Sequence, residues 1–172
     1  IPIEAALIGQ NIAPGFNRNF ASEEWEMIRK KHWDEAFEEA EDLANYDQEL
    51  AIFGHDINHK MIQISQDNAM EAGLSDLITF KQMQVKDLVI KEENGYLIGN
   101  PPYGKRIGED EEIITIYRDL GRIMKDHPSW SVYILTAYED FEAVYGQKAT
   151  KKRKLFNGFI KTDYYQYFGQ KV

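Results

Sequence analysis

Two prolines stand between an amide and an aromatic side chain at Asn100-Pro101-Pro102-Tyr103. Each proline fixes φ and removes a backbone donor, and the residue before a proline is pushed toward extended geometry. The carbonyls of Asn100 and Pro101 should therefore stay out of local helix bonds. Together with the Asn100 side-chain oxygen and the flat Tyr103 ring, they predict a socket for a planar group that carries an –NH2. The alternative is a proline-rich turn after a buried strand.

Such a socket suits the exocyclic amine of a nucleobase, whose lone pair is delocalised into the ring. Two acceptors, Asn100 Oδ1 and the Pro101 carbonyl, would favour a more tetrahedral nitrogen and aim its lone pair at an electrophile. A base must leave its stack to enter the socket, and flipping is the usual solution. The chain contains no cysteine, which excludes thiol catalysis, disulfides and cysteine-ligated metals within these residues.

A second group of polar residues, Gly54-His55-Asp56, follows another apolar run. A carboxylate at the end of a strand, with Gly54 allowing close approach, suits the two hydroxyls of a ribose. Asp56 could equally cap the helix that follows. His55 and His59 stand at helix-turn spacing, but no carboxylate set completes a metal site, so we expect no metal.

Hydrophobic periodicity predicts the elements that would position these residues. We expect helices over 3–7, 22–44, 57–72, 110–126 and 140–145. Gly73 should end the third of these helices, and the fourth carries an apolar stripe that includes Tyr117. We expect strands over 50–54, 77–81, 96–99, 131–135, 153–156 and 159–167, with Ser22 capping the second helix and Asn157-Gly158 as a hairpin turn. Alternating strands and helices predict an α/β fold with a mostly parallel sheet and an antiparallel C-terminal hairpin. Ligands bind beyond the carboxyl ends of such strands.

The net charge of −9 over 172 residues is unevenly distributed. Residues 23–50 hold 11 acids against three bases, a local charge of −8 that we interpret as a solvated helix surface. Residues 148–161 hold six Lys and Arg and no acid. That basic run is either a charged edge strand, where lysine prevents aggregation, or a patch that contacts phosphates.

Length and hydropathy set the remaining limits. The length suits one domain, and no apolar run approaches the roughly 18 residues of a membrane span. Residue 1 is Ile and no signal peptide is visible, so we expect a processed chain or a piece of a longer one.

Asn-Pro-Pro-Tyr after a parallel strand resembles the catalytic motif of S-adenosylmethionine (SAM)-dependent amino-methyltransferases, which methylate adenine N6, guanine N2 or a glutamine amide. Four further segments are similar to the 23S rRNA guanine-N2 methyltransferases, also labelled N6-adenine-specific DNA methylases: residues 1–6, residues 11–18, Gly104 with Arg106, and residues 152–158. The resemblance covers essentially the whole chain.

This resemblance implies a Rossmann-like SAM-dependent methyltransferase domain over residues 1–172. It also implies that the central first strand and its glycine-rich SAM loop, together with an N-terminal THUMP RNA-binding domain, lie upstream of Ile1 in a parent protein. By matching position, Asp56 would bind the SAM ribose and Ile57 would pack on its adenine ring. Gln84 stands where many members have an aspartate for the adenine amino group.

The resemblance also implies the substrate side of the site. Asn100, Pro101, Pro102 and Tyr103 would be the catalytic motif, and Asn100 would also bind the cofactor. Phe156, before Asn157-Gly158, would stack on the other side of the base, or is a hairpin core aromatic. The resemblance strengthens the phosphate-contact interpretation of Lys152, Arg153 and Lys154.

The expected activity is therefore methyl transfer from SAM to a base amine, chiefly guanine N2 of 23S rRNA in the cytoplasm. Adenine N6 methylation of RNA or DNA stays open, because both purines present an –NH2, although DNA is the less favoured substrate. A catalytically silent nucleotide- or RNA-binding module is the third hypothesis.

Overall fold

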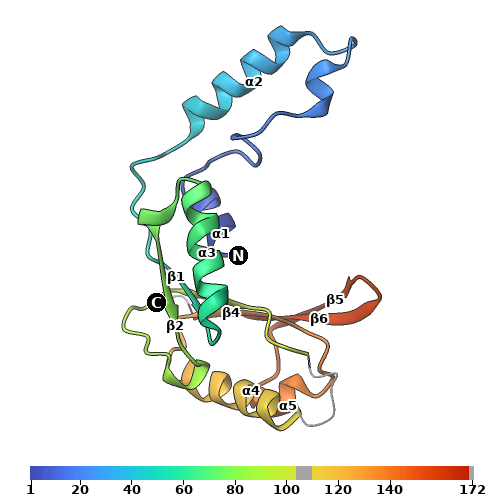
Figure 1. The fold of residues 1–172 in the computed structure, drawn as a ribbon. Helices are drawn as coiled ribbons and strands as arrows, with labels where there is room; N and C mark the ends of the chain where they lie inside the picture. Colours follow the sequence, from blue (N-terminus) through green and yellow to red (C-terminus); the bar gives the residue numbers. More distant parts are fainter. Residues whose placement is uncertain (104–109, 171–172) are drawn as a thin grey trace. The chain divides into compact units, whose positions relative to one another are not determined.

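The computed structural model describes residues 1–103 and 110–170, so Gly104 and Arg106 of the resemblance lie outside the described residues. The chain forms two compact units, Ile1–Met83 and Gln84–Val172 (Figure 1).

The first unit is built on two parallel strands, β1 (Ile52–Asp56) and β2 (Ile78–Gln82). Helices α1 (Pro2–Gly9) and α3 (His59–Glu71) pack with these strands. Ala6 of α1 and Ala69 of α3 are small and fully buried, which lets both helices pack closely, and together with Leu74 and Ile78 they form the core of this unit. A short 3-10 turn, η2 (Ser75–Leu77), leads from α3 into β2.

The expected helix over 22–44 is wrong at its start. Residues Ala21–Glu24 form a 3-10 turn, η1, and the helix α2 begins only at Lys30 and ends at Leu43. Trp25 is extended, and Ser22 makes no cap. The chain bends there because Phe20 stacks on Trp33, with ring centroids 5.5 Å apart. No residue of α2 is buried, which agrees with a solvated acidic surface.

The second unit contains a four-stranded sheet in the order β3-β4-β6-β5. Its strands are β3 (Tyr96–Gly99), β4 (Ser131–Thr136), β5 (Lys151–Asn157) and β6 (Ile160–Tyr167). β3 and β4 are parallel, whereas β6 is antiparallel to both β4 and β5. The α/β fold class and the antiparallel hairpin are thus confirmed, and β5 is an edge strand.

Helices α4 (Asp110–Lys125) and α5 (Phe141–Tyr145) cover one face of this sheet, while the 3-10 turn η3 (Val85–Asp87) packs on α4 (Figure 1). The buried core between helices and sheet is rich in aromatic rings: Tyr117, Phe141, Tyr145, Tyr165 and Tyr167. Gly121 lets α4 approach α5, since a Cβ there would overlap the carbonyl oxygen of Tyr145.

The described strands form two separate sheets, not one. A chain without a central strand is expected to look this way, but a strand supplied from upstream stays a prediction. No helix among the described residues is long and apolar enough to cross a membrane.

Candidate functional site

The proline motif lies at the carboxyl end of β3, where the sequence predicted it. Residues 100–103 are outside any helix or strand, with Asn100 and Pro102 exposed and Pro101 and Tyr103 half-buried. The Tyr103 hydroxyl donates a hydrogen bond of 2.6 Å to Asn100 Oδ1. The expected free amide acceptor is therefore already shared, although a carbonyl oxygen keeps a second lone pair for another donor.

A buried hydroxyl fixes the third residue of the motif. Tyr117 of α4 donates to the Pro102 carbonyl at 3.0 Å. Because that hydrogen is used, Thr136 at the end of β4 donates to the Tyr117 oxygen at 2.7 Å. The Tyr138 backbone N–H donates to Thr136 Oγ1 at 3.1 Å. Tyr117 and Thr136 are fully buried, and burial raises the pKa of the Tyr117 hydroxyl, so it remains a donor near neutral pH.

Sequence reasoning missed this chain of hydrogen bonds. It placed Tyr117 on the apolar stripe of a helix, which is correct for the ring but says nothing about the hydroxyl. The available signal was that a buried tyrosine or threonine needs a partner for its hydroxyl.

The carboxyl end of β1 carries the expected Asp56, which is the last residue of the strand and exposed. Its Oδ1 accepts from the Asn58 backbone N–H at 2.7 Å. The helix-cap alternative is wrong, because the N-cap of α3 is Asn58, whose side chain accepts from Lys60 N. Gln82, which the sequence analysis did not single out, donates from Nε2 to the Ile57 carbonyl at 2.9 Å and ties this loop to β2.

At Gly54 the structure shows close packing by a neighbouring strand, while the close approach of a ribose stays a prediction. Gly54 is buried, and a Cβ there would lie 2.5 Å from Cδ1 of Phe80 and also meet Pro2. The space above Gly54 is therefore filled by a side chain of the neighbouring strand. Ile57, by contrast, exposes 63% of its surface, so a large apolar side chain stands free beside the Asp56 carboxylate.

Gln84 caps η3 and is exposed, and its carbonyl accepts from Asp87 N at 3.1 Å. The site residues divide between the two units. Asp56 and Ile57 belong to the first, whereas Gln84, the proline motif and the hairpin residues belong to the second.

Phe156 lies near the tip of the β5–β6 hairpin and is 68% exposed, so the interpretation as a hairpin core aromatic is wrong. The two-residue turn is Gly158–Phe159, with Asn157 paired to Ile160 as the last strand residue. Gly158 has a φ of +61°, the conformation that glycine favours at the first position of such turns. The expected turn is therefore shifted by one residue.

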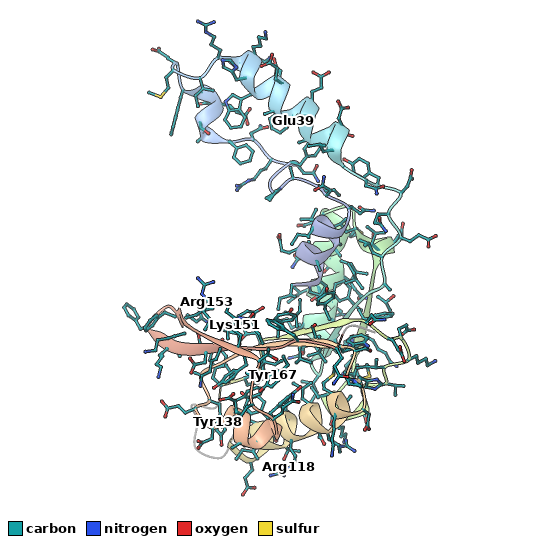
Figure 2. All side chains as sticks on the ribbon, turned by 180° about the vertical axis from the view of Figure 1, so that it is seen from behind. Glu39, Arg118, Tyr138, Lys151, Arg153 and Tyr167 are labelled. Carbon is teal, nitrogen blue, oxygen red and sulfur yellow. The ribbon has the colours of Figure 1, made fainter. Side chains whose placement is uncertain are left out.

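Four of the six bases of the run, Lys151, Lys152, Arg153 and Lys154, lie on the edge strand β5, where successive side chains point to opposite faces. Figure 2 shows Lys151 and Arg153 on the face of the sheet away from α4 and α5, with Tyr167 on the face toward them. Lys152 points to the helix face and pairs with Glu142 at 3.5 Å, its ammonium 5.3 Å from the centre of the Tyr165 ring. Lys154 is exposed.

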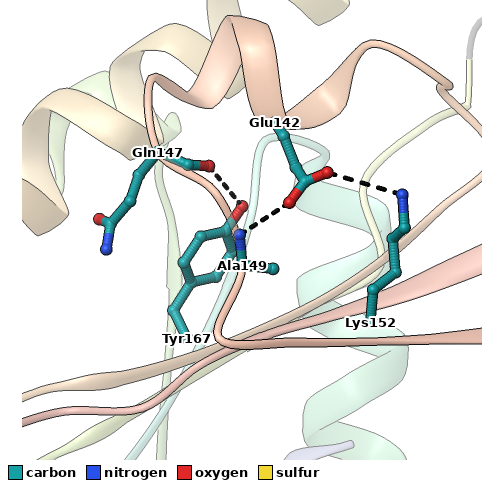
Figure 3. A network of polar contacts seen from close by, with 5 residues as sticks. All are labelled: Glu142, Gln147, Ala149, Lys152 and Tyr167. Carbon is teal, nitrogen blue, oxygen red and sulfur yellow. Dashed lines mark hydrogen bonds and ion pairs between the residues drawn. The ribbon is translucent and has the colours of Figure 1, made fainter.

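Besides its ion pair with Lys152, Glu142 accepts a hydrogen bond of 2.7 Å from the Ala149 backbone N–H with its other carboxylate oxygen (Figure 3). Nearby, the Tyr167 hydroxyl donates to the Gln147 carbonyl. These bonds fasten the segment between α5 and β5, so Lys152 serves to hold the hairpin in place. The predicted phosphate patch is thus split between two faces.

Among residues 1–103 and 110–170, no three His, Asp or Glu side chains gather where they could hold a metal ion. The pKa of His55 lies below its ordinary value because partial desolvation of this largely exposed ring, and then the nearby Lys81, disfavour the imidazolium. His55 is therefore neutral near pH 7.

Comparison with known proteins matches residues 1–166 to a family described as "RMKL-like, methyltransferase domain". YpsC of Bacillus subtilis (strain 168), provisionally named an RNA methyltransferase, is 61% identical over 170 residues, 99% of this chain and 44% of its own length. Ribosomal RNA large subunit methyltransferase K/L of Shewanella baltica (strain OS185) is 36% identical over 163 residues, 92% of this chain and 23% of its own.

Two crystal structures are similar throughout the chain. SMU.472, provisionally described as a methyltransferase and complexed with SAH, superposes with a TM-score of 0.94 at 46% identity over 99% of this chain and 45% of its own. A protein of Listeria monocytogenes str. 4b F2365, described as a predicted N6-adenine-specific DNA methylase, superposes with a TM-score of 0.91. It is 58% identical, over 99% of this chain and 44% of its own. The chain thus spans less than half the length of these relatives.

Proposed function

The chain belongs to the family of RMKL-like methyltransferase domains, and from that premise we propose that it transfers a methyl group from SAM to an exocyclic amino nitrogen of a nucleic-acid base. One observation carries this proposal: the Asn100–Tyr103 motif at the carboxyl end of β3, whose acceptors suit an –NH2 group. The complex of SMU.472 with SAH supports SAM as the methyl donor.

The residues at the end of β1 fit the cofactor. Asp56 is exposed and uses Oδ1 for the turn to Asn58, which leaves the carboxylate with acceptor capacity for ribose hydroxyls. The exposed Ile57 offers an apolar surface for an adenine ring. Bound there, SAM would supply an electrophilic methyl group: the S–CH3 bond would break to give S-adenosylhomocysteine, and the methylated nitrogen would release one proton to solvent. Gln84, at the start of η3, is retained as an acceptor for the adenine amino group.

On the substrate side, the Asn100 oxygen and the Pro101 carbonyl each accept a hydrogen bond from one N–H of the target amine. This removes the lone pair from conjugation with the ring and directs it at the electrophile, a stabilisation that is strongest in the transition state. The Tyr103 ring and the exposed Phe156 hold the two faces of the flipped base. Asn157, Lys152, Arg153 and Lys154 stand next to Phe156 on the same hairpin.

The substrate we propose is RNA, most specifically guanine N2 of 23S rRNA in the cytoplasm. The names of the Bacillus and Shewanella relatives support RNA, while that of the Listeria relative keeps adenine N6 of DNA as a second candidate. We also propose that the acting protein is longer than residues 1–172 and supplies the central strand, its glycine-rich loop and a THUMP domain upstream.

The proposal is tested by mass spectrometry of modified nucleosides from rRNA and DNA, isolated from cells with and without the gene. Loss of N2-methylguanosine from 23S rRNA alone is the expected result. Loss of N6-methyladenine would move the target to adenine, and the polymer affected would identify RNA or DNA. Unchanged nucleosides in both polymers would favour the silent binding module.

A further inference from the structure

We infer that Tyr117 is a positioning residue for the base amine: by holding the Pro102 carbonyl, it turns the Pro101 carbonyl toward the substrate. This inference rests on the proposed function, since it concerns the same motif. It adds to the motif a hydrogen bond from outside, which the Tyr117 hydroxyl donates to the Pro102 carbonyl.

The first step is the direction of the bond. A carbonyl only accepts, so the single Tyr117 hydrogen goes to Pro102, over 3.0 Å. Thr136 then satisfies the Tyr117 oxygen at 2.7 Å, and the Tyr138 backbone N–H satisfies Thr136. Each hydroxyl has one donor role and one acceptor role, so this arrangement leaves neither of them free to turn.

The second step is the rigidity of the supporting residues. Tyr117 and Thr136 both have 0% exposure. The Tyr117 ring lies edge-on to Phe141, with centroids 4.9 Å apart, and tilted against Tyr138 at 5.6 Å. The hydroxyl that reaches Pro102 is thus held by a packed core that joins α4, β4 and α5.

The third step concerns the motif itself. Asn100 and Pro101 each precede a proline, and both are therefore restricted to extended geometry. The Pro102 ring fixes φ, so only ψ of Pro102 sets the angle between the Pro101 and Pro102 carbonyls. A Pro102 carbonyl held by Tyr117 fixes that angle. The buried Tyr117 thereby fixes the direction of the Pro101 carbonyl, which we infer to be the direction from which the base approaches. Without the Tyr117 bond, the buried side of the motif would lose its partner and the loop could rotate.

The test uses the full-length protein with its rRNA substrate. Tyr117→Phe keeps the ring and removes only the hydroxyl, and we expect kcat to fall about 10- to 100-fold, the scale of misplacing a reacting group by roughly 1 Å. The KM for SAM should stay within about threefold. Tyr165→Phe is the matched control, because it removes another hydroxyl from a ring with 0% exposure in the same core, and it should keep wild-type kcat.

Thr136 provides a second, independent pair of variants. Thr136→Val removes the donor to Tyr117 and should lower kcat in the same direction, whereas Thr136→Ser restores the hydroxyl and should rescue it. Thr162→Val is the control, since Thr162 is 1% exposed and its hydroxyl has no partner among the described residues. An equal fall of kcat in Thr136→Val and in Thr136→Ser would contradict the hydrogen-bond argument.

Hydrogen–deuterium exchange of the segment 96–103 gives a readout that does not depend on methyl transfer. Faster exchange in Tyr117→Phe but not in Tyr165→Phe supports the inference, and equal exchange together with wild-type kcat overturns it. If the wild-type protein methylates no nucleic acid, the proposed function fails, and the exchange result alone then decides whether Tyr117 fixes the motif.

Discussion

The two groups of candidate residues, one in each unit, are built in different ways. The proline motif of the second unit is supported by the fully buried Tyr117 and Thr136. The end of β1 in the first unit is exposed, and it is shaped by the turn from Asp56 to Asn58 and by a hydrogen bond from Gln82. On the proposed function, the proline motif would aim a weak nucleophile and the end of β1 would bind the cofactor, which agrees with the firmer support of the motif.

The largest effect should come from the acceptor that touches the amine. Asn100→Ala in the full-length protein should lower the rate of methyl transfer by roughly 10²-fold or more, since a transition-state hydrogen bond is removed. The affinity for SAM, measured by calorimetry, should fall by much less than the rate, because Asp56 and Ile57 would still hold the cofactor. Asn68→Ala, at an exposed position of α3, is the control. A rate within twofold of wild type would refute the socket.

A smaller loss is expected on the cofactor side, and it should appear in affinity. Asp56→Asn keeps an oxygen for the turn to Asn58 but removes the carboxylate. If Asp56 binds the ribose, both Asp56→Asn and Asp56→Ala should weaken SAM binding about tenfold or more, the range for a hydrogen bond to a charged group. Wild-type affinity in Asp56→Asn would reduce Asp56 to a turn residue.

The basic residues of β5 also differ in role: we expect Lys151 and Arg153 to contact RNA and Lys152 to stabilise the fold. Replacing Lys151 and Arg153 by Ala should weaken RNA binding several-fold and flatten the plot of log affinity against log salt by about one unit for each phosphate that the protein no longer neutralises. Lys152→Ala should chiefly lower the melting temperature, because Lys152 pairs with Glu142. An equal change in the salt slope for all three residues would contradict the split of the basic run.

Helix propensity alone predicts the wrong sign at Gly121. Alanine normally stabilises a helix interior, but here its Cβ would overlap the Tyr145 carbonyl. We expect Gly121→Ala to lower the free energy of unfolding by about 1–3 kcal/mol, the usual cost of overpacking. Thr115→Ala, at an exposed site on the same helix, should be neutral or slightly stabilising. A stabilised Gly121→Ala would mean that α5 moves away freely.

The smallest effect concerns pH. His55 has a lowered pKa, so near and just below pH 6.5 the unfolded chain binds more protons than the folded one. Its contribution to stability is present above that pH and is lost as the pH falls through the folded-state pKa. The contribution should be small, because His55 is exposed. An NMR titration of the His55 ring should give a midpoint below 6.5, and a midpoint above that value would reverse the sign.

Local patterns in the sequence predicted most of the framework. The strand over 96–99 is confirmed at both ends, and the apolar stripe that includes Tyr117 does form the buried face of α4. Gly73 ends α3 with a φ of +71°, as its position predicted. These features depend on neighbours in the chain, and so a single sequence reveals them.

Contacts between distant residues account for what the sequence missed. The Phe20–Trp33 stack interrupts the expected helix. The partners of Tyr117 lie 15 and 19 residues away, and Lys152 meets Glu142 only because β5 passes α5. In the turn after β1, the sequence analysis considered Asp56 as the N-cap of α3, but Asn58, two residues later, is the cap.

The central claim is that the proline motif presents a base amine for methylation. The most direct measurement is methyl transfer from labelled SAM to unmodified 23S rRNA by the full-length protein, followed by digestion and mass spectrometry of the nucleosides. We predict that the label lies on the exocyclic amino nitrogen of a purine. Label on a ribose oxygen or a ring carbon, or no transfer to RNA or DNA at all, would contradict the claim.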